Sequence, residues 1–488
     1  MTCVIGLDLG TSAVKALLID ERQAVLAEAE VKLTTQHPAP LASEQDVEGW
    51  WEATVAALDQ LARAAPAAMA RVRAIGLAGQ MHAAVLLDAA DRPVRPAMLW
   101  NDTRAHAEAD ALKRLGLDLA RELGVPAMAG LTAPKLAWLA RHEPAAAART
   151  RHILLTKDVV RLRLTGERVT DVSDAAGTWL LDQALRTWSA RAIAATGLDP
   201  AWLPPVVEGS AVTGTLRPAL AARWGCGPGV VVAGGGGDTP AGGVGIGAVE
   251  DGQAYVSLGT SAQMFVAADA HRPAPEQLVH AFCHAVPGRW YQMAAMQNGA
   301  GVLSFVAGLL GVTDIAGLVA RVEAGFTGPS RLLVLPYLNG ERTPHDDPHA
   351  RGVVMGLTSD TSRTDLAQAA MEGVAFAFAD ARDALAAAGV RVAAAGFIGG
   401  GARSRLWGRM IAAVLGIPLH VYAGGERGPA FGAARLGWLA LGHAPANILV
   451  TPAIKETLLP EPGLTDLYAG RVAAFRRLYV ALQPEFAP

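Results

Sequence analysis

Val4-Ile5-Gly6-Leu7-Asp8-Leu9-Gly10-Thr11-Ser12-Ala13 is an apolar run that stops at a polar turn containing glycine. About half a chain later the pattern returns as Ala254-Tyr255-Val256-Ser257-Leu258-Gly259-Thr260-Ser261-Ala262. Each copy precedes another apolar run, at 14–19 and 264–267, so the repeated unit reads as strand, tight turn and strand. We therefore predict two domains of one plan, 1–247 and 248–488, facing each other across a cleft.

The composition indicates a folded α/β protein. The chain has 488 residues, a formal net charge of −3 and 51% hydrophobic residues, which excludes a disordered chain and argues against a dedicated nucleic-acid binder. The 53 glycines gather where apolar runs stop, for example at 234–247 and 424–432. Alanine-rich helical patterns lie between them, at 47–65, 365–388 and 406–415. Alternating strands and helices of this kind predict an α/β architecture.

The cysteine content and the hydropathy pattern indicate the cellular compartment of the protein. Cys3, Cys226 and Cys283 are too few to cross-link a chain of this size, so a reducing cytoplasm is expected. Early charges at Asp8 and Lys15 do not fit a signal peptide, and no run of about 18 apolar residues predicts a membrane span. We expect a soluble cytoplasmic protein without a membrane partner. The oligomeric state is not fixed by the sequence, and a homodimer is left open.

The first turn has the groups that a phosphate site needs. Gly10 lets backbone N–H groups face an anion, the Thr11 and Ser12 hydroxyls add donors, and Lys15 adds positive charge. Asp8 would repel phosphate directly but can hold Mg²⁺, which then bridges to it. A hairpin turn whose aspartate satisfies its own backbone is the alternative. A Walker-type loop is excluded, because its Gly-Lys-Ser/Thr ending is missing.

A second candidate site follows the apolar strand that begins at Val230. Four glycines, 234–237, separate this strand from a single carboxylate, Asp238. Pro240 suits the first turn of a following helix, which Asp238 or Thr239 could cap. The glycines remove side chains, so that a substrate can reach Asp238, and an accessible carboxylate suits a general base in phosphoryl transfer. Helix capping and general-base catalysis are the two interpretations.

Three other segments carry polar groups or glycines at strand ends. The segments 79–82 (Gly-Gln-Met-His) and 100–104 (Trp-Asn-Asp-Thr-Arg) are typical of sugar binding, although a single histidine such as His82 more often belongs to a core or a surface. The strand, glycine loop and helix pattern at 396–404 suits a nucleotide on a helix N-terminus.

Two segments receive no catalytic role. His280, Cys283 and His284 lie close together, but no second pair has zinc-finger spacing, so we expect a structural use. The segment 336–344 reads as an ordered surface loop whose role chemistry alone does not assign.

Two long patterns resemble signatures of the FGGY carbohydrate kinase family. The first is Gly130-Leu131-Thr132-Ala133-Pro134-Lys135-Leu136-Ala137-Trp138-Leu139-Ala140-Arg141-His142. The second begins Gly352-Val353-Val354-Met355-Gly356-Leu357 and closes with Leu366, Ala369, Ala370, Met371 and Glu372. The resemblance extends from Ile5 to about Arg435. The segments 43–46, 79–82, 100–102, 157–158, 173–177 and 340–344 are most similar to the bacterial members that phosphorylate D-xylulose.

The resemblance implies a fold, an activity and residue roles. The fold is two ribonuclease-H-like (actin-like) domains across a hinged cleft, with sugar mainly on the N-terminal domain and ATP mainly on the C-terminal one. The activity is in-line transfer of the ATP γ-phosphoryl group to D-xylulose, giving D-xylulose 5-phosphate, in pentose catabolism. By position, Asp238 matches the catalytic base of the family and Asp8 matches its metal-associated aspartate. The first phosphate loop corresponds to Thr11, Ser12 and Lys15, and the second corresponds to Gly259 and Thr260. The adenosine-side loop corresponds to Gly400, Gly401 and Ala402, and the ketose contacts correspond to Met81 and His82. Trp100, Asn101 and Asp102 complete the expected sugar site.

One departure and three alternatives stay open. Thr239 follows the base where the similar kinases usually carry Asn, and a shorter side chain there could shift the ketose or polyol preference. The alternatives are a kinase of the same family for another ketose or polyol, such as L-xylulose, ribulose or xylitol, a non-catalytic sugar-responsive regulator on an actin-like scaffold, and a filament-forming actin relative.

Overall fold

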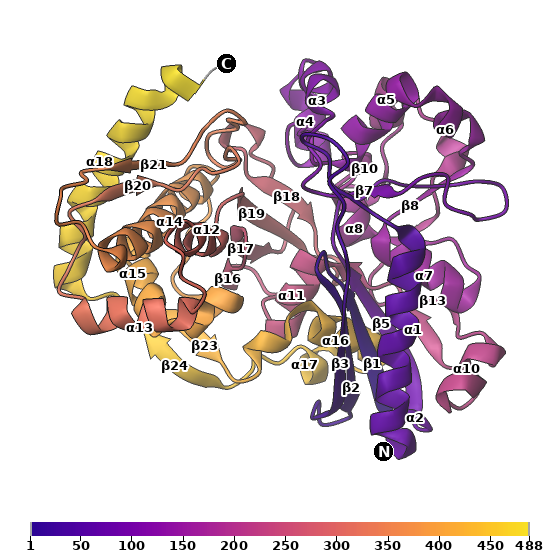
Figure 1. Ribbon diagram of the computed structural model, residues 1–488. Helices are drawn as coiled ribbons and strands as arrows, with labels where there is room; N and C mark the ends of the chain where they lie inside the picture. Colours follow the sequence, from indigo (N-terminus) through magenta and orange to yellow (C-terminus); the bar gives the residue numbers. More distant parts are fainter. Residues whose placement is uncertain (1, 487–488) are drawn as a thin grey trace.

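Two seven-stranded sheets organise the computed structural model, which describes residues 2–486 (Figure 1). The first sheet has the order β13-β14-β5-β1-β2-β3, with β15 beside β5. Its strands are β1 (Cys3–Leu9), β2 (Ala13–Asp20), β3 (Val25–Lys32), β5 (Val72–Gly79), β13 (Val212–Thr215), β14 (Val231–Ala233) and β15 (Gly236–Gly237). The predicted first hairpin is confirmed, because β1 and β2 pair antiparallel across the turn at residues 10–12.

The second sheet repeats this arrangement. Its strands are β16 (Ala254–Leu258), β17 (Ala262–Ala268), β18 (His280–Cys283), β19 (Trp290–Met296), β22 (Ala395–Ile398), β23 (Leu419–Tyr422) and β24 (Ile454–Leu458). The order β3-β2-β1-β5-β14-β13 in the first sheet matches β19-β17-β16-β22-β23-β24 in the second. Strand directions also match, since the pairs run antiparallel, antiparallel, parallel, parallel and antiparallel in both. The duplication predicted from the sequence repeat is confirmed.

Helices cover both faces of the first sheet, which explains why β1 is buried along its whole length and is apolar except for Asp8. Successive side chains of a strand point to opposite faces. Ile5 and Leu7 pack in the core that includes α1 (Val47–Ala64), whereas Val4 packs with α16 (Gly428–Ala440). Gly6 is needed on the α16 face, because a Cβ there would lie 1.9 Å from the carbonyl oxygen of Ala430.

Two packed helices lie between the two sheets, α11 (Asp238–Ile246) and α16 (Figure 1). They approach closely through small residues, and a Cβ on Gly432 of α16 would lie 1.8 Å from the carbonyl oxygen of Ala241 in α11. By sequence α16 belongs to the second half, yet it covers the first sheet. The domain boundary near residue 247 therefore stays a prediction. The helix α16, which follows that boundary in the sequence, packs against the sheet that precedes it.

The three helices predicted from alanine-rich patterns are confirmed as α1, α14 (Arg363–Ala387) and α15 (Arg405–Leu415). The remaining helices are α2 (Pro66–Met69), α3 (His106–Lys113), α4 (Leu117–Leu123), α5 (Thr132–His142), α6 (Pro144–Arg149), α7 (Thr156–Thr165), α8 (Val172–Ala176), α9 (Ala190–Thr196), α10 (Pro218–Trp224), α12 (Gly301–Leu309), α13 (Ile315–Gly325), α17 (Pro445–Ile448) and α18 (Pro462–Phe486). Short strands are β4 (Glu44–Gln45), β6 (Val85–Leu87), β7 (Ala97–Met98), β8 (His152–Leu154), β9 (Thr170–Asp171), β10 (Leu181–Asp182), β11 (Thr187–Trp188), β12 (Val206–Val207), β20 (Leu333–Leu335) and β21 (Val353–Met355).

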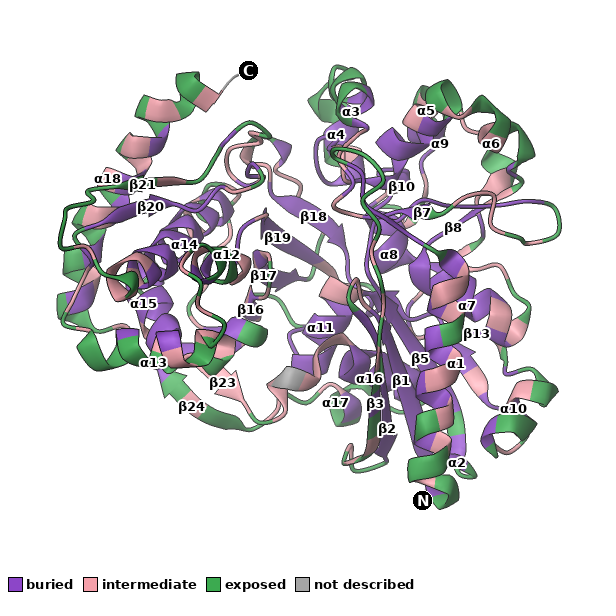
Figure 2. Cartoon of the chain, in the orientation of Figure 1, coloured by how far each residue is buried: buried purple, intermediate pink, exposed green. Residues whose placement is uncertain are grey.

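Burial follows this layering: the central strands of both sheets are buried, whereas the edge strands β3 and β24 and the outward faces of α10, α13 and α18 are exposed (Figure 2). Within residues 2–486, no helix combines the length and the apolar character that a membrane crossing requires.

The segment 336–344 is not a surface loop, and that expectation is wrong. Tyr337 and Thr343 are each 1% exposed, and Glu341 is 3% exposed. Thr343 N donates to the Ala295 carbonyl oxygen of β19 (3.1 Å), and Thr343 Oγ1 donates to the Leu278 carbonyl oxygen (2.9 Å). The segment is fixed against strands of the second sheet, which its polar composition does not reveal.

Candidate active site

A cavity of about 530 Å³ lies between the two halves of the chain, at the ends of both repeated hairpins. Its volume is that of a small-molecule site. The first half contributes Asp8, Thr11, Lys15, Met81, His82, Trp100, Asp238 and Thr239, and the second half contributes Ser257, Gly259, Ser261, Arg342, Gly400, Arg403 and Arg427, among others. The structure thus brings most of the predicted site residues of the first half, and Gly259 and Gly400 of the second half, to one cavity.

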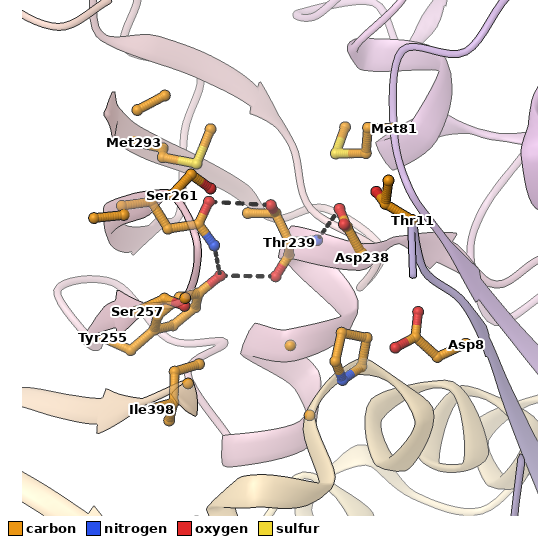
Figure 3. A pocket seen from close by; sticks show the side chains of 18 of the residues that line it. Asp8, Thr11, Met81, Asp238, Thr239, Tyr255, Ser257, Ser261, Met293 and Ile398 are labelled. Atoms are coloured by element: carbon orange, nitrogen blue, oxygen red, sulfur yellow. Dashed lines mark hydrogen bonds between the residues drawn. The ribbon is translucent and has the colours of Figure 1, made fainter. Parts of the chain in front are cut away.

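Asp238 is the first residue of α11 and faces this cavity (Figure 3). Its Oδ1 accepts a hydrogen bond from Thr239 N (2.8 Å). Burial raises the pKa of Asp238 to about 6, so the carboxylate is a stronger base than an exposed aspartate. The expectation that Asp238 or Thr239 caps the helix is wrong, because Gly237 occupies the N-cap position, while Pro240 does lie in the first turn.

Asp8 lies at the end of β1, is 7% exposed and faces the same cavity. Burial and the negative charge of Asp238 raise the pKa of Asp8 to about 7, and Lys15 opposes that shift. Its Oδ1 is buried without a hydrogen-bond partner among the described residues. Two carboxylates that repel each other beside an unsatisfied oxygen fit a divalent cation such as Mg²⁺. Across residues 2–486 no group of three or more His, Cys, Asp or Glu residues is placed to hold a metal ion, so further ligands would come from water or phosphate.

A hydrogen-bonded chain ties the first turn to the predicted sugar segments. Thr11 Oγ1 donates to Gln80 Oε1 (3.0 Å) and accepts from Trp100 Nε1 (3.0 Å). Gln45 Nε2 donates to the Thr11 carbonyl oxygen (2.6 Å). The turn is therefore held by polar residues of three different segments. Ser12 is exposed and does not line the cavity.

His82 has a fixed protonation state at the cavity wall. Its Nδ1 donates to the Gly177 carbonyl oxygen (2.7 Å), since a carbonyl only accepts, and burial lowers the pKa of His82 to about 3. The neutral ring therefore keeps Nε2 as an acceptor. The φ of His82 is 71°, and Lys135 of the first signature holds this turn by donating to the carbonyl oxygens of His82 (2.9 Å) and Gly130 (2.7 Å). His82 is therefore both buried and part of the cavity wall.

Trp100 lines the cavity, whereas Asn101 and Asp102 do not. Asp102 is fully buried. It accepts from Ser43 N (2.9 Å) and pairs with Arg104 Nη2 (2.6 Å). The structure thus gives Asp102 protein partners behind Trp100 in place of the sugar contact that was expected.

The predicted loops of the second half reach the cavity in part. Gly259 and Gly400 line it, while Thr260 is exposed and Gly401 and Ala402 lie outside the lining. Gly401 packs against Leu258, which a Cβ would approach to 2.4 Å.

Sequence reasoning missed two cations of the same wall, Arg403 and Arg427. The glycine cluster at 424–432 was the available signal for Arg427, because Gly425 and Gly428 of that cluster also line the cavity.

A closed set of hydrogen bonds joins α11 to the second sheet (Figure 3). Thr239 Oγ1 donates to Gln263 Oε1 (3.3 Å), and Gln263 Nε2 donates to the Tyr255 hydroxyl (3.2 Å). The Tyr255 hydroxyl donates to the Thr239 carbonyl oxygen (2.9 Å). Tyr255 and Gln263 were missed, although the repeated hairpin contains or adjoins both. The residue after Asp238 is therefore bonded to the opposite half.

Buried charges hold the glycine loop that leads to Asp238. Lys157 Nζ contacts carboxylate oxygens of Asp158 (2.6 Å), Asp171 (2.8 Å) and Asp174 (3.2 Å), and all four side chains are 0% exposed. Burial alone would lower the pKa of Lys157, but the three carboxylates hold it above its ordinary value. Arg161 also pairs with Asp158 and donates to the Gly234 carbonyl oxygen.

The cluster at 280–284 is buried. His284 Nε2 contacts the Ala248 carbonyl oxygen (3.2 Å), and Cys283 N donates to Gln183 Oε1 (2.9 Å). These side chains pack between β18 and its neighbours, which agrees with a structural use.

Comparisons with known proteins agree with this geometry. The family models for the N-terminal and C-terminal domains of the FGGY family of carbohydrate kinases match residues 3–245 and 254–441. A curated relative, the xylulose kinase of Escherichia coli (strain K12), is 43% identical over 485 residues, covering 99% of this chain and 100% of the relative.

Solved structures also match along the whole chain. One described as a xyloylose kinase from Brucella ovis has a TM-score of 0.93 at 44% identity, with 99% of each chain covered. The xylulose kinase of Rhodospirillum rubrum has a TM-score of 0.87 at 29% identity, also with 99% of each chain covered. The predicted two-domain, actin-like architecture is confirmed. The chain belongs to the FGGY family of carbohydrate kinases.

Proposed function

We propose that this protein transfers the γ-phosphoryl group of ATP to the terminal hydroxyl of D-xylulose, forming D-xylulose 5-phosphate. Family membership supports phosphoryl transfer to a carbohydrate, and the names of the similar kinases support xylulose as the acceptor. The observation that carries the proposal is the placement of Asp238, whose carboxylate opens onto a cavity shared by the sugar-side residues and the second-half glycine loops. The absence of clustered cysteines supports a cytoplasmic setting for the reaction.

Asp238 accepts the proton of the attacking hydroxyl in this proposal. With a pKa of about 6 it is ionised at neutral pH, yet it is a better proton acceptor than an exposed aspartate. His82 Nε2 accepts a hydrogen bond from a sugar hydroxyl, and Trp100 offers its ring as one wall. Lys15, Arg403 and Arg427 place positive charge where a triphosphate lies.

Positioning and electrostatics thus account for most of the catalysis. Mg²⁺ held by Asp8 would neutralise phosphate charge when bound. In this proposal, closure of the two halves around the substrates limits access of water as a competing acceptor.

The test is ADP release with D-xylulose, L-xylulose, D-ribulose, L-ribulose, xylitol and glycerol as acceptors. We expect release to depend on sugar and D-xylulose to have the highest kcat/KM. Equal ADP release with and without sugar would contradict the proposal and favour an actin-like ATPase. A higher kcat/KM for another acceptor would move the assignment to a second candidate, a family member for that ketose or polyol. Thr239 gives that candidate its support, because its hydroxyl already donates to Gln263.

A further inference from the structure

The segment 336–347 brings an arginine from the second half into the cavity. Arg342 lines the cavity together with Met81, His82 and Trp100 of the first half. Its guanidinium carbon lies 5.6 Å from the centre of the Trp100 ring, within the range of a cation–π contact. Arg342 therefore reaches across the cleft to the wall that carries the sugar-side residues.

The guanidinium of Arg342 lacks an acidic partner among the described residues. Its Nε is buried without a hydrogen-bond acceptor. The adjacent Glu341 is already engaged, because its carboxylate accepts from Gln297 N (2.5 Å), Arg342 N (2.9 Å) and Asn298 Nδ2 (3.1 Å). Arg342 as a whole is half-buried, and a donor that is shielded from water, such as this Nε, is costly unless a ligand supplies an acceptor.

The backbone on both sides of Arg342 is fixed. Thr343 is bonded to β19 and to the Leu278 carbonyl oxygen, and Glu341 N donates to the Asp347 carbonyl oxygen (2.8 Å). Tyr479 of α18 donates to Asp347 Oδ2 (2.8 Å). The arginine is therefore presented to the cavity by a rigid support, which lowers the entropy lost when it binds a ligand.

The positive charge of Arg342 lies close enough to His82 and His280 to affect their protonation. Burial first, and then nearby cations that include Arg342, lower the pKa of His82 and of His280 to about 3. Arg342 thus bears on the part of the cavity that His82 and Trp100 line.

We propose that Arg342 donates hydrogen bonds to adjacent oxygen atoms at the end of the sugar remote from Asp238, and so favours 2-ketoses. This inference rests on the proposed function. A guanidinium offers N–H donors in a rigid planar fork, which matches two neighbouring acceptors. In a 2-ketose these are the C1 hydroxyl and the C2 carbonyl oxygen. A C2 carbonyl is a pure acceptor and suits a donor-only side chain better than the C2 hydroxyl of a polyol.

The test compares Arg342→Gln and Arg342→Lys with the wild-type enzyme on D-xylulose and xylitol. Losing a charged hydrogen-bond donor costs about 1.5–3 kcal/mol, so we expect KM for D-xylulose to rise about 10- to 100-fold in Arg342→Gln. KM for ATP should stay within about twofold, and the preference for D-xylulose over xylitol in kcat/KM should shrink. Arg342→Lys keeps the positive charge but lacks the planar fork of donors, so its KM for D-xylulose should lie between those of the wild type and Arg342→Gln.

A matched control is Arg351→Gln, because Arg351 is an exposed arginine near the same segment. It should leave both KM values unchanged. A merely structural role for Arg342 predicts lower kcat/KM for both sugars in equal proportion together with a raised KM for ATP, and that result would overturn the proposal. Phosphorylation of an aldonate in preference to D-xylulose, lost in Arg342→Gln, would also overturn it, since the acceptor would then be a carboxylate.

Calorimetric titration with D-xylulose separates this inference from the proposed function. If the wild-type enzyme releases no ADP with D-xylulose, the proposed function fails, whatever the variants do. The Arg342 assignment is then decided by binding alone. It stands if Arg342→Gln weakens D-xylulose binding about 10-fold or more, and it fails if the variant binds the sugar as tightly as the wild type.

Discussion

Asp238 and Asp8, the proposed base and the proposed metal-associated aspartate, are buried carboxylates, which links their proposed roles to a cost in stability. Each is a carboxylate at an element end beside the same cavity, and burial raises the pKa of both. A buried charged carboxylate destabilises the fold, but it also makes a base that works near neutral pH.

Replacing Asp238 by Asn should lower kcat by about 10²- to 10⁴-fold, because a positioned base is lost while the shape of the side chain is kept. KM for ATP should change little, since Asp238 lies at the start of α11 and not in the second-half glycine loops. Steady-state kinetics with ADP detection measures both. Turnover close to the wild-type value in this variant would show that Asp238 is not the base.

The pH dependence follows from the same residue. A base with a pKa of about 6 is active only when ionised, so log kcat/KM should be level above that pH and fall as the pH drops below about 6. If Asp8 also has to be ionised, the fall begins nearer pH 7 in metal-poor buffer and moves to lower pH as Mg²⁺ is added. A profile that stays level down to pH 4.5 would contradict both assignments.

Asp8→Asn should stabilise the metal-free protein at pH 8. The pKa of Asp8 is raised to about 7 in the folded state, so its ionised form above pH 7 opposes folding, and the neutral amide removes that penalty. We expect a gain of about 1–3 kcal/mol in the free energy of unfolding at pH 8, which shrinks as the pH falls below 7, where the folded state binds the proton.

Urea unfolding at several pH values, with chelator present, tests this expectation. Asp110→Asn is a suitable control, because that side chain is 64% exposed and its neutralisation should change little. Lower stability of Asp8→Asn at pH 8 would show that the Asp8 carboxylate has partners that offset its burial. The same variant should respond less to Mg²⁺ in activity assays.

At the scale of elements, the strand β15 and the start of α11 depend on the charges beneath them. Lys157 of α7 contacts three wholly buried carboxylates, and Arg161 of the same helix pairs with one of them and binds the Gly234 carbonyl oxygen of the glycine loop. The loop before Asp238 therefore derives its shape from α7, which is far away in the sequence.

Lys157→Met should destabilise the protein by about 3–5 kcal/mol, because Asp171 and Asp174 lose their buried cation while Arg161 still pairs with Asp158. Lys32→Met is the control, since Lys32 is exposed on the edge strand β3 and should change stability by less than about 0.5 kcal/mol. Urea unfolding followed by circular dichroism measures the difference. A loss below about 1 kcal/mol for Lys157→Met would mean that the carboxylates bind protons instead and do not need the lysine.

The elements themselves were predictable where the signals are local. The repeated hairpins follow from apolar runs that stop at glycine turns, and α1 and α14 follow from helical periodicity. Asp238 was also within reach, because four glycines before a single carboxylate are a local pattern.

Long-range packing was beyond the sequence. Burial of the segment 336–344 depends on hydrogen bonds to β19 and on support from α18, so its polar residues looked like a surface loop. The contacts of Asp102 with Ser43 and Arg104, and the link from Thr239 to Tyr255, likewise need the folded arrangement.

At the scale of the whole molecule, the crossing of α11 and α16 joins the two halves. Gly432→Ala places a methyl group 1.8 Å from the Ala241 carbonyl oxygen, a backbone atom that cannot move without shifting α11 and Asp238 with it. We expect a loss of about 1–3 kcal/mol in stability and a lower kcat. Thermal unfolding and steady-state kinetics measure the two effects.

Gly470→Ala is the matched substitution in an open place. Gly470 lies within α18, and a Cβ there would meet nothing within 4 Å. This change should raise stability by about 0.5–1 kcal/mol, because alanine favours a helix. If Gly432→Ala behaved like Gly470→Ala, the close approach of α11 and α16 would not be what holds the halves together.

The return of α16 to the first sheet sets an order for folding on the ribosome. The strands β1 and β5 emerge early, but the helix that covers Val4, Gly6 and Ala74 ends at residue 440. Until α16 has been synthesised, this apolar face of the first sheet stays uncovered in the nascent chain. Synthesis proceeds at about 5–20 residues per second, which sets how long the face is exposed. The first half thus completes its packing only after residue 440 has been synthesised.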